Sequence, residues 1–263
     1  MKKFLSLFYI FLVLAFIYVP ILVLIVYSFT GSVIIGNWTG FSFELYAKLF
    51  TEERIRNMII STVLLAVGAG ILSTILGTMG AIGIYYSKGK FGKIIKGSSS
   101  ISVINAEIVT GISLALVFSL ITFGKTYFSL IIGHMVLCTP FVVLSVTPKL
   151  KQMDSSLYEA ALDLGASPTK ALFKVVIPEI LPGIFSGFML AITLSLDDYI
   201  ITVFTKPETF DTISTYVYNA VKNQAKSELP ALRALSAVIF LIMVIVVVIM
   251  NIRANKKVAK EAR

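Results

Sequence analysis

The chain has 263 residues, of which 57% are hydrophobic and only 14% are charged, and its mean hydropathy is +0.91. Soluble domains carry about a quarter charged residues, so this composition excludes a soluble domain and predicts an integral membrane protein. A net charge of +9 can indicate nucleic-acid binding, but the placement of the basic residues favours a topology signal. The single cysteine, Cys138, excludes an intrachain disulfide, a zinc cluster and a thiol redox pair.

Six apolar segments predict transmembrane helices, each long enough to cross a hydrocarbon core of about 30 Å. They cover roughly residues 7–29, 58–86, 98–123, 127–148, 183–204 and 234–252. The first apolar run is too long for a signal-peptide core of about 7–15 residues, so we expect a retained helix. The sequence therefore predicts an all-α integral membrane protein with about six transmembrane helices, in one domain over residues 1–263.

Lysine and arginine are distributed unevenly between these spans. With the N-terminus placed inside, fifteen of the 23 basic residues lie in inner segments and eight in outer segments. Cytoplasmic segments carry the excess of basic residues. We therefore expect a multi-pass protein of the cell membrane with both termini in the cytoplasm, in contact with lipid and not with nucleic acid.

The second span carries a stripe of small residues at helical spacing, which predicts close approach of a neighbouring helix. Its members are Ala66, Gly70, Ser73, Gly77 and Ala81. The absence of charge between residues 57 and 87 predicts that this helix is tilted or extends beyond the bilayer. In the fourth span, Pro140 predicts a kink.

Across the six spans, the only ionisable residues among Asp, Glu, Lys, Arg and His are Glu107, His134, Asp197 and Asp198. An acid at a helix centre costs about 2.5–3.5 kcal/mol unless water, a proton or a cation compensates. Glu107 and Asp197 fall in the middle third of their spans, which is consistent with one shared cavity. Because adjacent helical residues diverge by about 100°, Asp197 and Asp198 cannot both point straight into one pore.

A structural interpretation of these residues stays open. The acids can hydrogen-bond to Ser195, Thr193 or backbone groups inside the bundle, and a lone histidine such as His134 commonly does no more than bond a neighbour. Metal ligation needs several convergent ligands, and none accompanies His134 at suitable spacing, so no metal site is expected.

The inner segment of about residues 149–182 reads SSLYEAALDLGASPTKALFKVVIPEILPG from Ser155. Ser156 and Glu159 have the spacing of a capping box, which predicts the start of a short helix. Gly165 is typical of a helix end. The side of this helix formed by small and apolar residues can dock in a groove on a partner, or the segment can be a plain link between two spans. These residues are Leu157, Ala160, Ala161 and Leu164.

A second helix follows directly. Ser167 is a suitable N-cap, and Pro168 occupies the first helical position, where the missing N–H has no cost. Pro178 and Pro182 are expected to interrupt the helical pattern where the chain returns to the membrane. The pattern thus predicts a helix, a turn and a helix on the inner face.

This segment resembles the EAA loop of the binding-protein-dependent ABC transporter permeases. The likeness rests on Glu159-Ala160-Ala161, Gly165 and Ile180-Leu181-Pro182. In that family the loop is a coupling helix that sits in a cleft of the ATPase subunit, so the resemblance implies a coupling role for Glu159, Ala160, Ala161 and Gly165. It also implies an importer of the type I permease fold. The chain has no G-x-x-x-x-G-K-[ST] phosphate loop, so we expect ATP and Mg to be bound by a separate ATPase and no cofactor in this chain.

Two further stretches resemble the second membrane subunit of the spermidine/putrescine permeases. They are LSLDDYIITVF from Leu194 and NAEIVTGISLALVF from Asn105. The resemblance implies a polyamine, a polycation that suits unpaired acids, and a substrate pathway formed by Asp197, Asp198, Glu107, Tyr199 and Asn105. It further implies a second permease subunit, two ATPase subunits and an extracytoplasmic polyamine-binding protein.

Other functions remain as alternatives. The same machine could carry another cation or a small organic solute. A proton-coupled secondary transporter, with the three acids as proton carriers, belongs to a different class. A membrane enzyme is disfavoured by the lack of a Ser/His/Asp set at one depth, and a simple channel by the elaborate inner segment.

Overall fold

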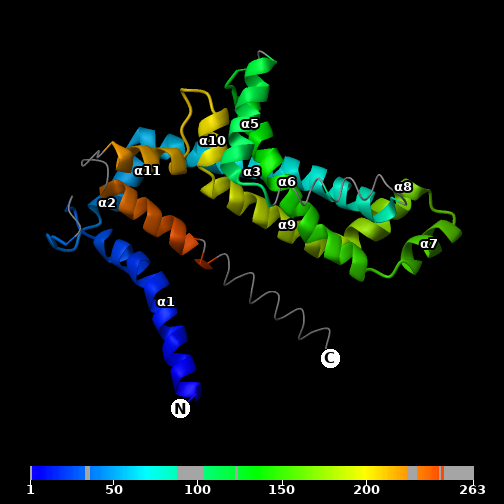
Figure 1. The fold of residues 1–263 in the computed structure, drawn as a ribbon, viewed down its shortest axis with the longest axis horizontal. Helices are drawn as coiled ribbons and strands as arrows, with labels where there is room; N and C mark the ends of the chain where they lie inside the picture. Colours follow the sequence, from blue (N-terminus) through cyan, green and yellow to red (C-terminus); the bar gives the residue numbers. More distant parts are fainter. Residues whose placement is uncertain are drawn as a thin grey trace. The chain divides into compact units, whose positions relative to one another are not determined.

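The computed structural model describes residues 2–32, 36–87, 97, 104–121, 124–223, 230–242 and 244–245. Within this part of the chain every regular element is a helix, which confirms the predicted all-α fold (Figure 1). In chain order the helices are α1 (Lys2–Tyr27), α2 (Glu44–Thr51), α3 (Glu53–Tyr86), α5 (Glu107–Leu120), α6 (Tyr127–Gln152), α7 (Ser156–Asp163), α8 (Pro168–Ala171), the π-helix η1 (Leu172–Val176), α9 (Ile177–Asp197), α10 (Ile200–Thr205) and α11 (Ile213–Lys222).

Four stretches of helix among the described residues are long and apolar enough to cross a membrane: Leu5–Tyr27, Glu53–Tyr86, Tyr127–Gln152 and Pro168–Asp197. Two shorter apolar helices, Glu107–Leu120 and Pro230–Ile242, coincide with parts of the predicted third and sixth spans. Residues 98–103, 122–123, 243 and 246–252 of those two predicted spans lie outside the described residues. Residues 105 and 106 are described and are not helical, so the third span does not run unbroken through Glu107 as predicted. At 34 residues, α3 is about 51 Å long, well beyond the hydrocarbon thickness, as its uncharged sequence predicted.

The fifth span differs from the prediction of one helix over 183–204. The helix begins much earlier, at Pro168, and ends at Asp197. Asp198 has an extended backbone (φ −65°, ψ 127°), and the chain resumes as the short helix α10. The helix stops because the Asp198 carboxylate accepts hydrogen bonds from backbone N–H groups of the next turn, which replaces continuation of the helix with an N-cap.

Pro178 and Pro182 do not interrupt this helix, contrary to the sequence prediction, and both lie within its length. The five residues before Ile177 form the π-helix η1, in which the Ile177 N–H donates to the Leu172 carbonyl. A π turn widens the helix locally, so the proline ring and its missing N–H are accommodated without a break. The inner segment and the fifth span are therefore one continuous helix.

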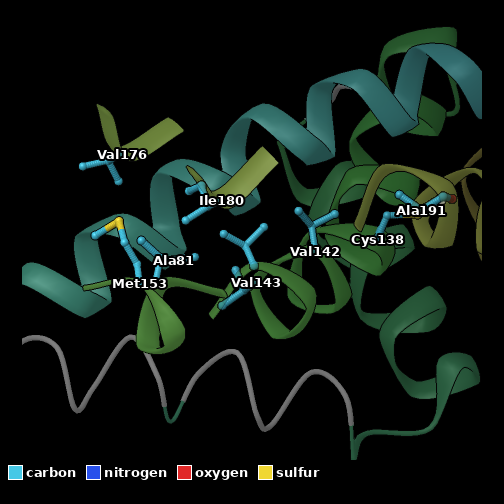
Figure 2. Close-up of a cluster of buried hydrophobic side chains, with 10 residues drawn as sticks. Ala81, Cys138, Val142, Val143, Met153, Val176, Ile180 and Ala191 are labelled. Carbon is cyan, nitrogen blue, oxygen red and sulfur yellow. Dashed lines mark hydrogen bonds between the residues drawn. The ribbon is translucent and has the colours of Figure 1, made fainter. Parts of the chain in front are cut away.

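Residues 58–216 form one compact unit, with its core between α3, α6 and α9. Figure 2 shows Cys138, Val142 and Val143 of α6 lying among Ala81 of α3 and Ile180 of α9. All five side chains are buried. The buried hydrophobic side chains of this unit therefore gather where α3, α6 and α9 meet.

The small-residue stripe of α3 faces this core. A Cβ atom added at Gly77 would lie 2.6 Å from the Cβ of Val142 in α6, and one at Gly70 would lie 2.9 Å from Ile192 of α9. Such distances leave no room for a side chain, because real Cβ contacts are longer. The stripe's predicted role in close packing is confirmed.

Residues 1–57 and 217–263 form the other unit, of which the described part is partly helical. After α1 the chain folds over α2, where Tyr46 contacts Phe29 with ring centroids 5.1 Å apart and its hydroxyl lies 2.6 Å from Ser28 Oγ. Arg233 donates to the Ser32 carbonyl. The contacts of Tyr46 hold α2 against the residues that follow α1.

Candidate functional site

The first candidate region is the helix α7, which begins differently from the prediction. Ser156 and Glu159 do not form a capping box; Ser156 is the first helical residue, and no side-chain cap comes from Ser155. Instead Asp154 Oδ1 accepts the Ser156 N–H at 2.9 Å. Hydrogen bonds from the backbone and side chain of Ser156 lower the pKa of the Asp154 carboxyl, so it holds the cap as a carboxylate.

The end of α7 matches the sequence prediction. Gly165 has φ +83°, in the left-handed region that glycine adopts without strain. Its N–H donates to the Leu162 carbonyl and the Ala166 N–H donates to the Ala161 carbonyl, which together make a Schellman motif. Next, Ser167 Oγ accepts the Lys170 N–H, so the predicted cap of the second helix is confirmed. The loop between the helices is therefore a fixed turn.

One side of α7 rests on the bundle and the other is exposed. The half-buried Tyr158 ring lies against Tyr86 at the end of α3, with centroids 5.1 Å apart. On the opposite side Leu157, Ala160 and Leu164 are exposed, and Leu164 is 89% exposed. An exposed strip of apolar side chains on a short helix that ends in a fixed turn is suited to dock in a groove on a partner protein.

The second candidate region surrounds the break between α9 and α10. Asp198 is buried, with only 6% of its surface exposed. Its Oδ1 accepts the Ile201 N–H at 3.1 Å, and its Oδ2 accepts the Thr202 N–H and hydroxyl, both at 2.7 Å. The carboxylate thus has its partners inside the chain and caps α10.

Asp197 has different surroundings although it is the adjacent residue. It is exposed, and it is the last residue of α9. The last four carbonyls of a helix have no intrahelical partner, and of these the Leu196 carbonyl accepts a hydrogen bond from Ser214 Oγ at 3.2 Å. Helix C-termini attract cations, so a carboxylate at this point concentrates negative charge at one open helix end.

Glu107 lies at another helix terminus, as the exposed first residue of α5. One turn later, Gly111 packs against α10: an added Cβ would lie 2.8 Å from Phe204 and 3.5 Å from Ile200. Glu107 therefore precedes this α5–α10 contact by four residues on one segment, and Asp197 precedes it by three residues on the other. Both acids are at helix ends, Asp197 at the break after α9 and Glu107 at the start of α5, and transporters commonly place ion and substrate groups at ends of interrupted helices.

The two remaining predicted pathway residues are Asn105 and Tyr199. Asn105 is exposed and donates from Nδ2 to Thr110 Oγ1 at 3.0 Å, across the start of α5. Tyr199 is half-buried and stands at the N-cap position of α10, between Asp198 and the helix. The structure thus brings Asp197, Asp198 and Tyr199 together at one break.

His134 was not among the predicted pathway residues, yet it lies at this break. It is fully buried on α6, with Nδ1 2.7 Å from Ser195 Oγ and Nε2 3.1 Å from Thr202 Oγ1. The sequence interpretation of a histidine bonded to its neighbours is therefore confirmed. The signal that could have placed it is its rarity, since it is the one histidine in the chain.

Comparison with known protein families identifies the family of this chain. The family described as binding-protein-dependent transport system inner membrane component matches residues 1–259. The chain belongs to this family. The permease is therefore a multi-pass membrane component of a transport system, and the interpretations as a secondary transporter, channel or membrane enzyme are set aside.

Individual relatives agree. The permease is 31% identical over 235 residues to the spermidine/putrescine transport system permease protein PotC of Haemophilus influenzae, covering 89% of this chain and 91% of that protein. It is also 31% identical to PotC of Escherichia coli K12, over 87% of each chain. For the putrescine transport system permease protein PotI of Escherichia coli K12, the identity is 31%, with 84% of this chain and 81% of that protein covered.

A solved structure shares the fold. It is a crystal structure of a bacterial ABC transporter involved in the import of the acidic polysaccharide alginate, with a TM-score of 0.73 and 18% identity, covering 96% of this chain and 95% of that one. At this identity the likeness concerns the fold alone. That transporter is involved in the import of an acidic polysaccharide, so the fold alone does not fix the charge of the cargo.

Proposed function

We propose that the permease carries polyamines, spermidine or putrescine, into the cytoplasm as one of two membrane subunits of an ATP-driven importer. The observation that carries this proposal is the likeness, at 31% identity over most of the chain, to permeases named for spermidine and putrescine. A polyamine is a flexible polycation, so its pathway needs anionic groups that have no cation of their own.

The placement of Asp197 supports a cationic cargo. The residue is an exposed acid at the C-terminal end of an apolar helix, where both the carboxylate and the helix carbonyls are negative. Hydrocarbon is a costly environment for such a group, so it faces a cavity, a partner or the cargo. Glu107, exposed at the start of α5, supplies a second acid, and Tyr199 offers a ring for cation–π contact.

The α7 segment supports coupling to a separate ATPase. In this proposal two ATPase subunits bind ATP and Mg, and the exposed strip of Leu157, Ala160 and Leu164 docks into one of them. Glu159, Ala161 and Gly165 share this coupling role in the proposal, and Gly165 forms the turn that ends α7. The excess of basic residues in inner segments supports a cytoplasmic location for this loop and both termini. A second permease subunit and an extracytoplasmic polyamine-binding protein complete the importer.

The test is uptake of radiolabelled spermidine into vesicles that contain this chain with the partners encoded beside it, with and without internal ATP. ATP-dependent accumulation that unlabelled putrescine or spermidine suppresses is the expected result. If the complex hydrolyses ATP in response to its binding protein but no polyamine moves, the importer stands and the cargo is wrong. Uptake that follows a proton gradient and ignores ATP would contradict the mechanism itself.

A further inference from the structure

His134 connects both sides of the break in the fifth span. It is fully buried on α6 and contacts Ser195 in the last turn of α9 and Thr202 in the first turn of α10. The sequence separations are 61 and 68 residues, so this is a tertiary link and not a local cap. One side chain of a neighbouring helix therefore bridges the two segments on either side of Asp198.

The hydrogen bonds at the break form a chain with one consistent direction. Thr202 has a single hydroxyl proton, which it donates to Asp198 Oδ2 at 2.7 Å. The Thr202 oxygen is then an acceptor for the N–H on His134 Nε2, which leaves Nδ1 to accept the Ser195 hydroxyl proton. A neutral imidazole in this tautomer satisfies every member of the chain, from Ser195 to the Asp198 carboxylate.

This chain of bonds holds the two acids in different environments. The Asp198 carboxylate is kept inside by its bonds to α10, and His134 Nε2 lies 3.7 Å from it. Asp197 precedes it as the exposed end of α9. If α9 instead continued as helix through Asp198 and Tyr199, its last carbonyls would gain partners, and Asp197 would be in the helix interior. The break is therefore what makes Asp197 an open helix end.

We propose that His134 is a positioning residue for transport: together with Asp198 it locks the break between α9 and α10 and so fixes Asp197 toward the pathway. The inference rests on the proposed function for the role of Asp197. His134 itself touches no cargo in this arrangement, and acts through Ser195 and Thr202.

The first experiment measures the position of residue 197 without any polyamine. Cys138 is the single cysteine and is buried, so the parent chain gives a low background with a charged, water-soluble thiosulfonate reagent. In the assembled complex, the labelling rate of Asp197→Cys is compared alone and with His134→Leu or His134→Gln. We expect His134→Leu to change the rate about tenfold, and His134→Gln, which keeps one donor and one acceptor, to restore most of it.

Two control variants separate positioning from general stability. Val146→Ala truncates a fully buried side chain on the same helix, away from the break, and should leave the labelling rate unchanged. Ser195→Ala removes only one arm of the link and serves if His134→Leu does not assemble; we expect a smaller change in the same direction. Its matched control is Ser186→Ala, whose hydroxyl bonds the Pro182 carbonyl within α9.

The second experiment measures spermidine uptake in vesicles with the same variants. We expect His134→Leu to raise KM about tenfold while ATP hydrolysis stimulated by the binding protein persists, with partial rescue in His134→Gln. Equal loss of assembled protein in His134→Leu and Val146→Ala, with unchanged labelling and KM, would overturn the positioning role. A changed labelling rate in a complex that moves no polyamine would leave the lock established and the proposed cargo wrong.

Discussion

The Tyr158 ring of α7 lies against the Tyr86 ring at the end of α3, with centroids 5.1 Å apart and planes inclined at 46°. Tyr86 in turn packs edge-on against Tyr85 at 4.9 Å. This aromatic contact joins α7 to the long span that carries the small-residue stripe. If α7 couples to an ATPase as proposed, the contact gives its movement a route to α3 besides the chain that leads into α8.

Replacing Tyr158 with Ala removes this contact and should weaken coupling between ATP hydrolysis and uptake. An aromatic pair contributes about 0.5–1.5 kcal/mol beyond burial, so we expect uptake per ATP hydrolysed to fall about two- to tenfold. The measurement is the ratio of spermidine uptake to phosphate release in the same vesicles. Tyr158→Phe keeps the ring and is the matched control. An unchanged ratio in Tyr158→Ala would show that α7 transmits movement through α8 alone.

The close approach of α3 and α6 at Gly77 predicts a specific loss of stability. Gly77→Ala places a Cβ 2.6 Å from Val142 Cβ and 3.1 Å from the Thr139 carbonyl, so overpacking should cost about 1–3 kcal/mol. The control is Gly83→Ala in the same helix, where an added Cβ meets nothing within 4 Å. The thermal midpoint of the detergent-purified complex is expected to fall in the first variant only. Equal midpoints would mean that α3 and α6 are further apart than the structure places them.

Asp197 and Glu179 stand at opposite ends of α9 and offer a charge-matched comparison. Both side chains are exposed, but Glu179 lies inside the continuous helix from Pro168 to Asp197, whereas Asp197 is its last residue. If Asp197 contacts the polycation, Asp197→Asn should raise KM for spermidine about tenfold. This is the change in affinity expected from the loss of one charge-assisted hydrogen bond. Glu179→Gln should leave KM unchanged. A KM that is the same in both variants would remove Asp197 from the pathway.

The cap of α7 has a pH dependence that follows from Asp154. Its hydrogen bonds from Ser156 hold the pKa of the carboxyl below its ordinary value of 3.8. For a lowered pKa, the stabilisation is complete above the ordinary value and is lost only as the pH falls through the folded pKa. Amide hydrogen exchange across α7 should therefore show constant protection from about pH 8 to about pH 5.

Variants of Asp154 separate the cap from its charge. Asp154→Ala removes the acceptor and should increase exchange at the start of α7, whereas Asp154→Asn keeps an acceptor oxygen and should lose less protection. Loss of wild-type protection near pH 6 would assign the cap to a different group. Equal protection in wild type and Asp154→Ala would show that α7 does not depend on this bond.

The features that were predictable from sequence are those set by neighbouring residues. The turn at Gly165, the cap at Ser167 and the stripe around Gly77 follow from local chemistry and helical spacing, and the structure confirms each. The start of α7 was misassigned by one residue, because spacing alone favoured a capping box at Ser156, whereas Asp154 accepts the Ser156 N–H and the helix begins at Ser156.

The break at Asp198 could not be predicted in the same way. The apolar pattern continues through Ile200 and Ile201 without a glycine or proline, so periodicity indicates one unbroken span. The break depends on His134, which lies 61 residues before Ser195 in the sequence and meets it only in the fold. For the same reason, sequence could not distinguish the buried Asp198 from the exposed Asp197.

The continuous helix from Pro168 to Asp197 has the geometry of a lever. Among its glycines, Gly183 approaches α6 most closely: an added Cβ would lie 2.8 Å from Lys149 and 3.2 Å from the Ser145 carbonyl. At 1.5 Å per residue, this fulcrum is about 22 Å from Pro168 and about 21 Å from Asp197. With arms of nearly equal length, a tilt that lifts the α8 end by a given amount lowers the Asp197 end by almost the same amount. If α9 pivots at Gly183 in transport, a displacement at the α7–α8 turn would therefore reach Asp197 with its direction reversed.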